Sequence, residues 1–247
     1  MKPYDELYLK KKIEEYNNLI SLDRIGNFEI KKINNNSEYI DGYMYKKRGK
    51  INTSVIELHG PNNVWMRISP IEIESSYMFI KYAKGKVGVV GLGLGFVVQE
   101  LAKKPEVDEV IVYEIEKDVI DLYYLNFKNN SKIKIINKDA FEAKRENFDY
   151  FFVDIYEYKL DYRVVEDYKK FNTLHNINEY FFWGMEHFLL SCRYEEIVWV
   201  YIPETWMEVS KKMFTSLQEA GLLKYYKQLD EKLVSNVLSG LKVLLDD

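Results

Sequence analysis

The chain has 247 residues, enough for one large domain or for one domain with a smaller attachment. Hydrophobic residues make up 47% and charged residues 30%, so the chain can bury a core without disulfides or metals, and a single cysteine excludes a disulfide within it. The formal net charge of −4 argues against the basic face that nucleic-acid-binding proteins usually carry, so we expect no nucleic-acid partner.

Membrane and metal sites are not expected either. No run of the sequence approaches the ~18 consecutive apolar residues that a membrane helix needs. The lone cysteine and the polar first residues are typical of a protein in a reducing compartment, and we expect a cytoplasmic location. The three histidines, His59, His175 and His187, lie far apart and accompany no cysteine cluster, so no metal site is predicted.

The first 80 residues predict a helix and a small sheet. Apolar residues recur at helical spacing between residues 4 and 22, at Leu9, Ile13, Tyr16 and Ile20. Four short runs with strand character follow, separated by turn-rich segments: FEIKKI, YIDGYMY, TSVIEL and VWMRI. We therefore expect an amino-terminal helix and an antiparallel sheet of about four strands.

A second helix is predicted from Ser69 to about Ala83. Ser69 can accept from exposed backbone N–H groups, Pro70 fits the first turn, and Glu72 completes a capping box. Gly85 provides the stop signal at the other end.

From residue 86 onward, apolar runs alternate with amphipathic segments. The runs VGVV, VIVYEI, IKII, YFFVDI and IVWVYI are typical of strands buried on both faces. Helices are expected near residues 96–103, 117–127, 179–190, 206–220 and 232–245, and residues 222–229 can add one more strand. The pattern predicts an α/β fold with a Rossmann-like, doubly wound, mostly parallel sheet in residues 81–247, preceded by the helix and small sheet of residues 1–80.

A glycine-rich stretch follows the first buried strand and opens a helix. It places Gly91, Leu92, Gly93 and Gly95 where a ligand can lie against bare backbone, although a structural turn without a ligand has the same appearance. A dinucleotide fingerprint is G-x-G-x-x-G, whereas here the third glycine comes one residue sooner. The spacing resembles the glycine loop of class I S-adenosylmethionine-dependent methyltransferases.

Glu114 ends the second buried strand, 19 residues after Gly95. A carboxylate at this tip can accept hydrogen bonds from both hydroxyls of a ribose. The alternative is that Glu114 is an exposed charge at the end of a strand, which is how we interpret Glu116.

The resemblance extends to two later elements. In the methyltransferase family an acidic residue after the third strand meets the adenine amino group and a neighbouring apolar residue covers the ring, which implies these roles for Asp139 and Ala140. A simple helix N-cap is the alternative for Asp139. The run FDYFFVD resembles the family's fourth strand and brings Asp154 to the ligand-binding edge of the sheet. The resemblance implies S-adenosylmethionine, or its decarboxylated form, as the cofactor.

Three functions remain open. One is methyl transfer to a small-molecule acceptor, with Asp154 removing a proton. The residues that follow Asp154 are IYEY, which departs from the D-P-P-Y motif of amino-methylating DNA enzymes. A second is aminopropyl transfer, because the arrangement of a small sheet, a helix and this core resembles spermidine synthase. Its D-x-x-D motif implies that Asp154 and Glu157 hold and deprotonate an amine. The third is a non-catalytic nucleoside-binding regulator.

The spermidine synthase resemblance is partial. The chain has GLGLG where that family has G-G-G-D/E-G, and the Y-H-E motif is not found. The same resemblance implies a homodimer through the amino-terminal sheet. Cys192 is interpreted as a buried thiol and His175 as a solvent-facing histidine.

Overall fold

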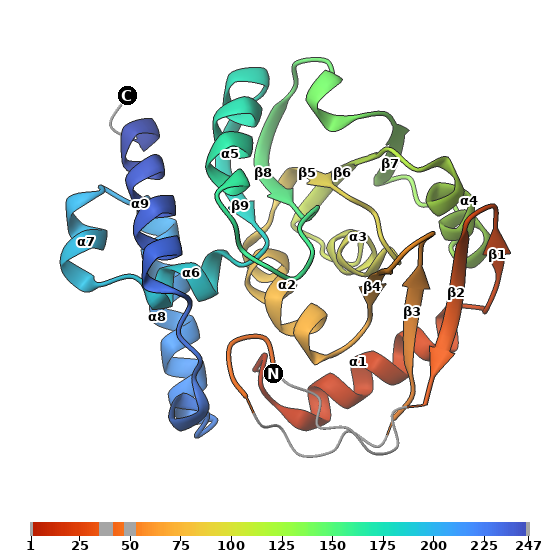
Figure 1. Ribbon diagram of the computed structural model, residues 1–247. Coiled ribbons are helices and arrows are strands. Elements are labelled where there is room, and N and C mark those ends of the chain that lie inside the picture. Colours follow the sequence, from red (N-terminus) through yellow and green to blue (C-terminus); the bar gives the residue numbers. More distant parts are fainter. Residues whose placement is uncertain (1, 35–41, 47–52, 246–247) are drawn as a thin grey trace.

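The computed structural model describes residues 2–34, 42–46 and 53–245 (Figure 1). Its first half comprises α1 (Glu6–Leu19), β1 (Arg24–Ile25), β2 (Phe28–Ile33), β3 (Val55–His59), β4 (Val64–Arg67), α2 (Pro70–Tyr82), β5 (Gly85–Val90), α3 (Phe96–Ala102) and β6 (Val107–Glu114). Its second half comprises α4 (Lys117–Asn126), β7 (Ile133–Asn137), η1 (Ala140–Glu142), β8 (Asn147–Val153), α5 (Arg163–Leu174), β9 (Asn176–Phe182), α6 (Met185–Ser191), α7 (Tyr194–Trp199), α8 (Glu204–Glu219), η2 (Leu223–Tyr225) and α9 (Glu231–Leu245).

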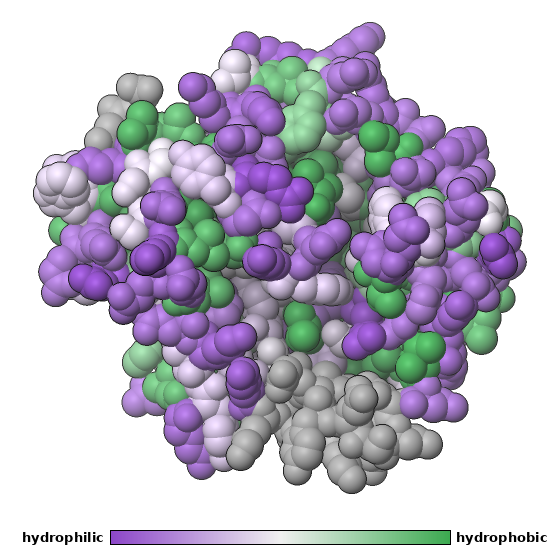
Figure 2. Space-filling model, in the orientation of Figure 1, coloured by the Kyte–Doolittle hydropathy of each residue, from purple (hydrophilic) through white to green (hydrophobic). Residues whose placement is uncertain are grey.

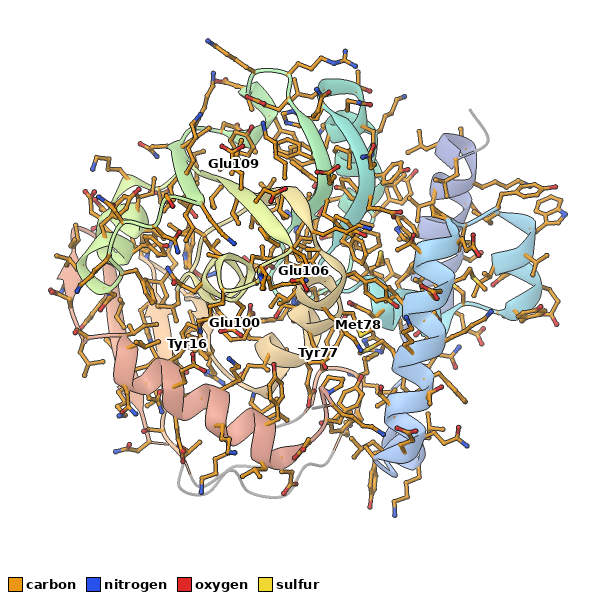
Figure 3. All side chains as sticks on the ribbon, turned by 180° about the vertical axis from the view of Figure 1, so that it is seen from behind. Tyr16, Tyr77, Met78, Glu100, Glu106 and Glu109 are labelled. Carbon is orange, nitrogen blue, oxygen red and sulfur yellow. The ribbon has the colours of Figure 1, made fainter. Side chains whose placement is uncertain are left out.

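Helix α1 confirms the amino-terminal helix, and its apolar stripe is buried as its spacing predicts. The Asp5 side chain caps it by accepting from the Leu7 N–H at 2.9 Å. On the inner face, the Tyr16 ring packs edge-on against Phe96, with 4.9 Å between ring centroids. The Tyr16 hydroxyl donates to Glu100 at 3.0 Å (Figure 3). Both partners belong to α3, so α1 is fastened to the larger domain.

The small sheet has the predicted four antiparallel strands, in the order β1-β2-β3-β4, but one member differs from the prediction. The two-residue strand β1 pairs with β2, whereas the run YIDGYMY contributes none of the four. Residues 39–41 of that run lie outside the described residues, and the rest forms an isolated bridge, Tyr45 with Tyr226. Long-range pairing, which local propensity does not encode, decides this membership.

The larger sheet is a five-stranded parallel sheet in the order β7-β6-β5-β8-β9, which confirms the Rossmann-like prediction. Successive side chains of β8 point to opposite faces. Phe151 packs on Phe171 of α5, and Phe152 stacks on Phe79 of α2 with 4.5 Å between centroids. Helices therefore cover both faces. Strands β6 and β7 are added on one side of β5, and β8 and β9 on the other, so the strand order reverses between β5 and β8.

The carboxyl-terminal third departs from prediction at three places. The segment expected as a helix from residue 179 is strand β9 up to Phe182, and α6 starts only after Gly184, whose φ is +92°. The first half of the run IVWVYI ends helix α7 and the rest follows it as a turn; Ile197 and Val200 are buried while Val198 and Trp199 face solvent. That is a helical spacing of buried positions, which a short apolar run conceals.

Of the two elements predicted after residue 221, one is wrong and one is confirmed. Residues 222–229 contain the short helix η2 and the single bridge residue Tyr226 instead of a further strand. The predicted final helix is confirmed as α9, with Val234, Leu238 and Leu241 buried. None of the described helices is both long enough and apolar enough to span a bilayer. The face in Figure 2 is mostly hydrophilic, with hydrophobic residues in small separate groups.

Helix α2 connects the two sheets and is held at its carboxyl end by a lysine. The Lys104 ammonium donates to the backbone carbonyls of Ile80, Lys81 and Ala83, at 2.6, 2.9 and 2.6 Å. These carbonyls belong to the last turn, where a cation is favoured. At the other end the predicted capping box is wrong: the Ser69 side chain makes no capping hydrogen bond, and Glu72 is 2% exposed and turned inward.

Candidate functional site

The glycine loop links β5 to α3 at the point where the strand order reverses. Gly91 has a φ of +96°, a left-handed conformation that favours glycine. A Cβ at this position would lie 2.4 Å from the carbonyl oxygen of Asp154. Gly91 is therefore what allows the loop to lie directly against the end of β8.

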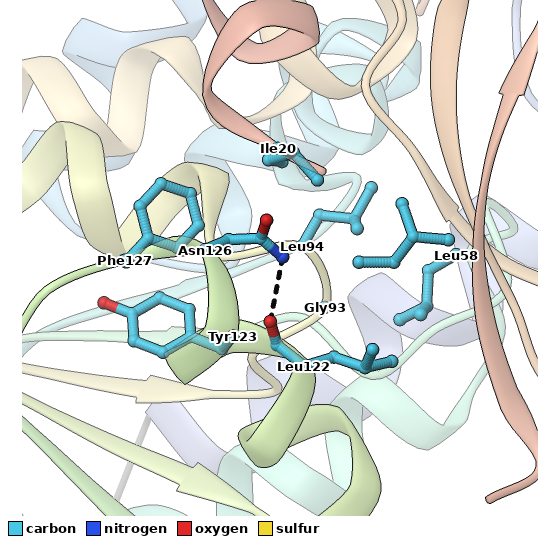
Figure 4. A pocket seen from close by; sticks show the side chains of 9 residues that line it. Ile20, Leu58, Gly93, Leu94, Leu122, Tyr123, Asn126 and Phe127 are labelled. Carbon is cyan, nitrogen blue, oxygen red and sulfur yellow. Dashed lines mark hydrogen bonds between the residues drawn. The ribbon is translucent and has the colours of Figure 1, made fainter. Parts of the chain in front are cut away.

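The small sheet reaches the same loop. The Met66 sulfur accepts from the Leu94 N–H at 2.9 Å, and a Cβ on Gly93 would lie 2.4 Å from it. On the α4 side, Gly93 and Leu94 line a cavity of about 10 Å³ together with Ile20, Ile30, Leu58, Leu122, Tyr123, Asn126 and Phe127 (Figure 4). This space holds no more than one water molecule, so it is too small for a ligand on that side of the loop.

Glu114 is buried, with 6% of its surface exposed, so it is not an exposed strand-end charge. Its two carboxylate oxygens accept from the backbone N–H groups of Leu92 and Glu116, each at 2.9 Å. Burial raises its pKa, against the effect of these hydrogen bonds. Each oxygen of a carboxylate has a second lone pair, so this group retains acceptor capacity. Its role as a ribose ligand stays a prediction.

Asp139 caps the short helix η1, accepting from the Phe141 N–H at 2.9 Å. This is the alternative that the sequence left open for it. Ala140 is buried, with 6% of its surface exposed. The adenine contacts of both residues stay predictions.

Two exposed isoleucines at the carboxyl edge of the sheet were missed by sequence analysis. Ile115 follows Glu114 and is 61% exposed, while Ile155 follows Asp154 and is 41% exposed. The Ile155 Cγ2 atom would lie 3.5 Å from a Cβ on Gly91. Both read as ends of buried strands in the sequence, so the only available signal was their position directly after the acidic residues.

An acidic pair lies beside the loop, formed by Asp154 and Glu72 of α2. The Asp154 N–H donates to Val90 at 3.0 Å, which sets the residue at the end of β8. Burial raises the pKa of Asp154 to about 7. Burial and then repulsion from Asp154 raise the pKa of Glu72 well above its usual range. Two carboxyl groups that interact in this way titrate as a unit and resist double ionisation.

Tyr158 completes the acidic pair. Its hydroxyl donates to Glu72 Oε2 at 3.2 Å, and it also accepts from the Arg67 N–H at 3.2 Å. The other oxygen of Glu72, Oε1, is buried and has no hydrogen-bond partner among the described residues. Such a buried acceptor costs stability until a donor reaches it. The pair therefore has an unused capacity to accept a proton or an N–H.

Glu157, predicted as the second catalytic acid, is exposed at the turn after β8. The carboxyl group whose pKa is raised by repulsion from Asp154 is that of Glu72, 82 positions earlier in the chain. No local spacing connects these two residues, so sequence analysis had no signal for the pair. The role of Glu157 stays a prediction.

The remaining candidates lie apart from this site. His175 is 1% exposed, so its assignment as solvent-facing is wrong; it packs among Phe148, Phe151 and Phe171, and burial lowers its pKa. Cys192 is half-buried, and burial raises its pKa to about 12, which makes its thiol unreactive. Within the described part of the chain, no group of three or more His, Cys, Asp or Glu side chains can hold a metal ion.

No protein-family model and no curated protein matches the chain. Among solved structures it is similar to spermidine synthase from Thermotoga maritima, at 14% identity and a TM-score of 0.39 over 64% of this chain and 52% of that one. It is similar to Trm5b from Pyrococcus abyssi at 16% identity and a TM-score of 0.40, over 69% and 54% of the two chains. The 23S rRNA methyltransferase ErmE matches over 30% of each chain, at 25% identity and a TM-score of 0.26.

These matches span less than two thirds of each solved structure and are weak in TM-score. They do not determine an activity, and the expectation that no nucleic acid is a partner stays a prediction. The solved structures to which the chain is similar include methyltransferases, one of them described as S-adenosylmethionine-dependent, and spermidine synthase.

Proposed function

We propose that the protein binds S-adenosylmethionine at the glycine loop and transfers its methyl group to a small-molecule acceptor. When bound, this cofactor supplies an electrophilic methyl carbon, whose bond to sulfur breaks with the electron pair left on sulfur as the bond to the acceptor forms. The protein must hold the nucleoside, align the acceptor and remove one proton from it.

The residues around Gly91 fit a nucleoside. Ile115 and Ile155 present apolar surface at the tips of β6 and β8, which suits the faces of an adenine ring. Glu114 retains acceptor capacity for the ribose hydroxyls, and its attachment to Leu92 keeps its carboxylate beside the loop. Asp139 and Ala140 follow the next strand at the same edge of the sheet.

The acidic pair accounts for the proton. With a pKa of about 7, Asp154 is partly ionised at neutral pH and matches the range in which a general base works best. Repulsion from Asp154 raises the pKa of Glu72, which disfavours ionisation of both groups at once. A proton released by the acceptor is taken up by this pair, and Tyr158 stabilises its charged form by donating to Glu72.

The observation that carries the proposal is the juxtaposition of a left-handed glycine loop with a raised-pKa carboxylate: Gly91 lies against the backbone of Asp154 itself. Calorimetry with S-adenosylmethionine, S-adenosylhomocysteine and decarboxylated S-adenosylmethionine tests it. We expect S-adenosylmethionine and S-adenosylhomocysteine to bind. A folded protein that binds none of the three would refute the proposal.

Aminopropyl transfer is the second candidate, and the acidic pair is the observation that favours it. An ammonium group near Glu72 and Asp154 would supply the donor that Glu72 Oε1 lacks and would lower the pKa of both carboxyl groups. A preference for decarboxylated S-adenosylmethionine over the intact form supports this candidate. Binding of the intact form without modification of any amine, hydroxyl or thiol supports a non-catalytic regulator instead.

A further inference from the structure

A cavity of about 360 Å³ lies beyond Tyr158, between the segment 42–46, the start of α6 and the segment 227–233. Its volume is that of a small-molecule site. Tyr158 is common to this cavity and the acidic pair, because its ring lines the cavity and its hydroxyl bonds to Glu72. The cavity is therefore the space from which an acceptor reaches Asp154, if the proposed function holds.

Aromatic rings form one wall of the cavity. Trp183 packs edge-on against Tyr158 and Tyr43, with ring centroids 5.5 and 5.6 Å apart. The Trp183 ring nitrogen donates to Ser75 at 3.0 Å, which holds the indole in place. Ile71, Leu160, Leu229 and Leu233 add apolar surface. Such walls favour a ligand with a ring or another apolar body.

The charges of the lining have one sign. Lys46, Lys159 and Lys227 line the cavity, and no Asp or Glu does so among the described residues. All three ammonium groups belong to exposed residues, and none forms an ion pair with a residue that the structure describes. In a chain with a net charge of −4, a cavity lined by three lysines and no acid is a selective feature.

Nearby buried acids offset this charge only in part. Burial raises the pKa of Glu186 to about 8, so it is mainly protonated at neutral pH. Glu74 accepts from the Tyr43 N–H at 2.8 Å and from the Tyr45 hydroxyl at 2.7 Å. These hydrogen bonds favour its ionised form, so it sets one buried negative charge behind the wall against the three lysines.

Backbone pairing fixes two of the lysines relative to each other. Lys46 donates its N–H to Tyr225, and Lys227 donates its N–H to Met44, on either side of the bridge between Tyr45 and Tyr226. The bridge therefore brings the backbones of Lys46 and Lys227 close together, and Lys159 joins them in the lining from the segment after β8.

We propose that this cavity binds an acceptor with an anionic group, a carboxylate or a phosphate, attached to a ring or another apolar body. The aromatic wall holds the body, the three lysines hold the anion, and the nucleophile at the other end reaches Asp154 past Tyr158. The statement that the bound molecule is the acceptor of the reaction rests on the proposed function. It also separates the two candidate reactions, because a simple diamine would meet three lysines of its own sign.

Calorimetry with matched ring compounds tests the proposal. The probes are phenylacetate, phenyl phosphate, phenylacetamide and phenethylamine, each titrated into the full chain with and without S-adenosylhomocysteine. We expect at least one anion to bind on the order of tenfold or more tighter than the amide and the amine, since charge-assisted hydrogen bonds are the strong ones. The carboxylate and phosphate arms show which anion is preferred.

Two sets of variants locate the effect. The triple variant Lys46→Ala, Lys159→Ala, Lys227→Ala should lose at least about tenfold in anion affinity. The control Lys11→Ala, Lys169→Ala, Lys211→Ala removes three exposed lysines elsewhere and should bind as the unaltered protein does. Lys159→Glu should shift the preference toward phenethylamine.

Phenethylamine binding as tightly as the anions overturns the proposal, and so does an anion affinity that the first triple variant leaves unchanged. Failure of both anions to bind also overturns it. Binding of S-adenosylhomocysteine is measured separately: if it fails while an anion binds in the cavity, the proposed function falls and the cavity assignment stands.

Discussion

Two buried carboxylates near the glycine loop, Glu114 and Glu72, differ in what holds them. Glu114, at the end of β6, accepts from two backbone N–H groups. Glu72, beside the end of β8, accepts from one tyrosine hydroxyl and keeps one buried oxygen without a partner among the described residues. The difference teaches that the first group serves as a fixed anchor, while the second belongs to a site that is completed by a ligand or a proton.

The largest expected effect is on turnover. Asp154→Asn removes the proton acceptor, and we expect kcat to fall by about 10²- to 10⁴-fold, the usual contribution of a general base, while affinity for S-adenosylhomocysteine is kept. Glu72→Gln should lower kcat more than Glu157→Gln, because Glu72 is buried and interacts electrostatically with Asp154, whereas Glu157 is exposed. If Glu157→Gln has the larger effect in the same assay, the D-x-x-D resemblance describes this site better than the pair does.

The next largest effect is on folding. Gly91→Ala combines a left-handed backbone with a Cβ 2.4 Å from a backbone oxygen, and we expect a loss of about 2–4 kcal/mol in the free energy of unfolding. Gly221→Ala is the matched control: its φ is +67°, but nothing lies within 4 Å of the added Cβ, so about 1–2 kcal/mol is expected. Urea denaturation of both variants measures the difference. Equal losses would mean that the loop can withdraw from β8.

The anchor itself is tested by Glu114→Gln. We expect affinity for S-adenosylhomocysteine to fall by about 1–3 kcal/mol, because charge-assisted hydrogen bonds to the ribose become neutral ones. Glu116→Gln, which leaves the backbone N–H that bonds to Glu114 in place, is the control and should bind normally. Unchanged affinity in a folded Glu114→Gln protein would reject the ribose role and leave this carboxylate as a support for the loop.

The most gradual effect is a pH dependence of stability, which is small for any single pH unit. Asp154 has a folded-state pKa of about 7, raised from 3.8 by burial, so between these values the folded state binds the proton and the unfolded state has released it. Stability therefore falls as pH rises from about 4 to about 7, by at most about 1.4 kcal/mol per pH unit from this group. Asp154→Asn should remove that slope. Comparing the variant with the unaltered protein in urea between pH 5 and 7 cancels the opposite contribution of His175, whose pKa is lowered.

The sequence predicted the doubly wound core well because its signals are local. Apolar runs of β-branched and aromatic residues mark β5, β6, β7 and β8, although β7 is an edge strand and is only half-buried instead of buried on both faces. Gly91 and Glu114 lie where the strand order reverses. Beyond β8 the signals conflict. The edge strand β9 ends in consecutive aromatic residues that suit a helix equally well, and α7 has too few residues to show a period.

The site was only half predictable for a related reason. Gly91 and Glu114 carry roles in the backbone of one βαβ unit, which spacing can reveal. Glu72 and the lysines of the cavity come from segments far apart in the chain, and only folding brings them together. Glu72 also matched a helix-capping pattern, so a plausible local explanation concealed its place beside Asp154.

The attachment of α2 has a consequence for the geometry of the site. Lys104 donates to carbonyls at one end of this helix, while near the other end Glu72 belongs to the acidic pair and Glu74 accepts from the N–H of Tyr43 in the segment that lines the cavity. The acidic pair and that segment therefore share one backbone support, because Glu72 and Glu74 are two residues apart on the same helix.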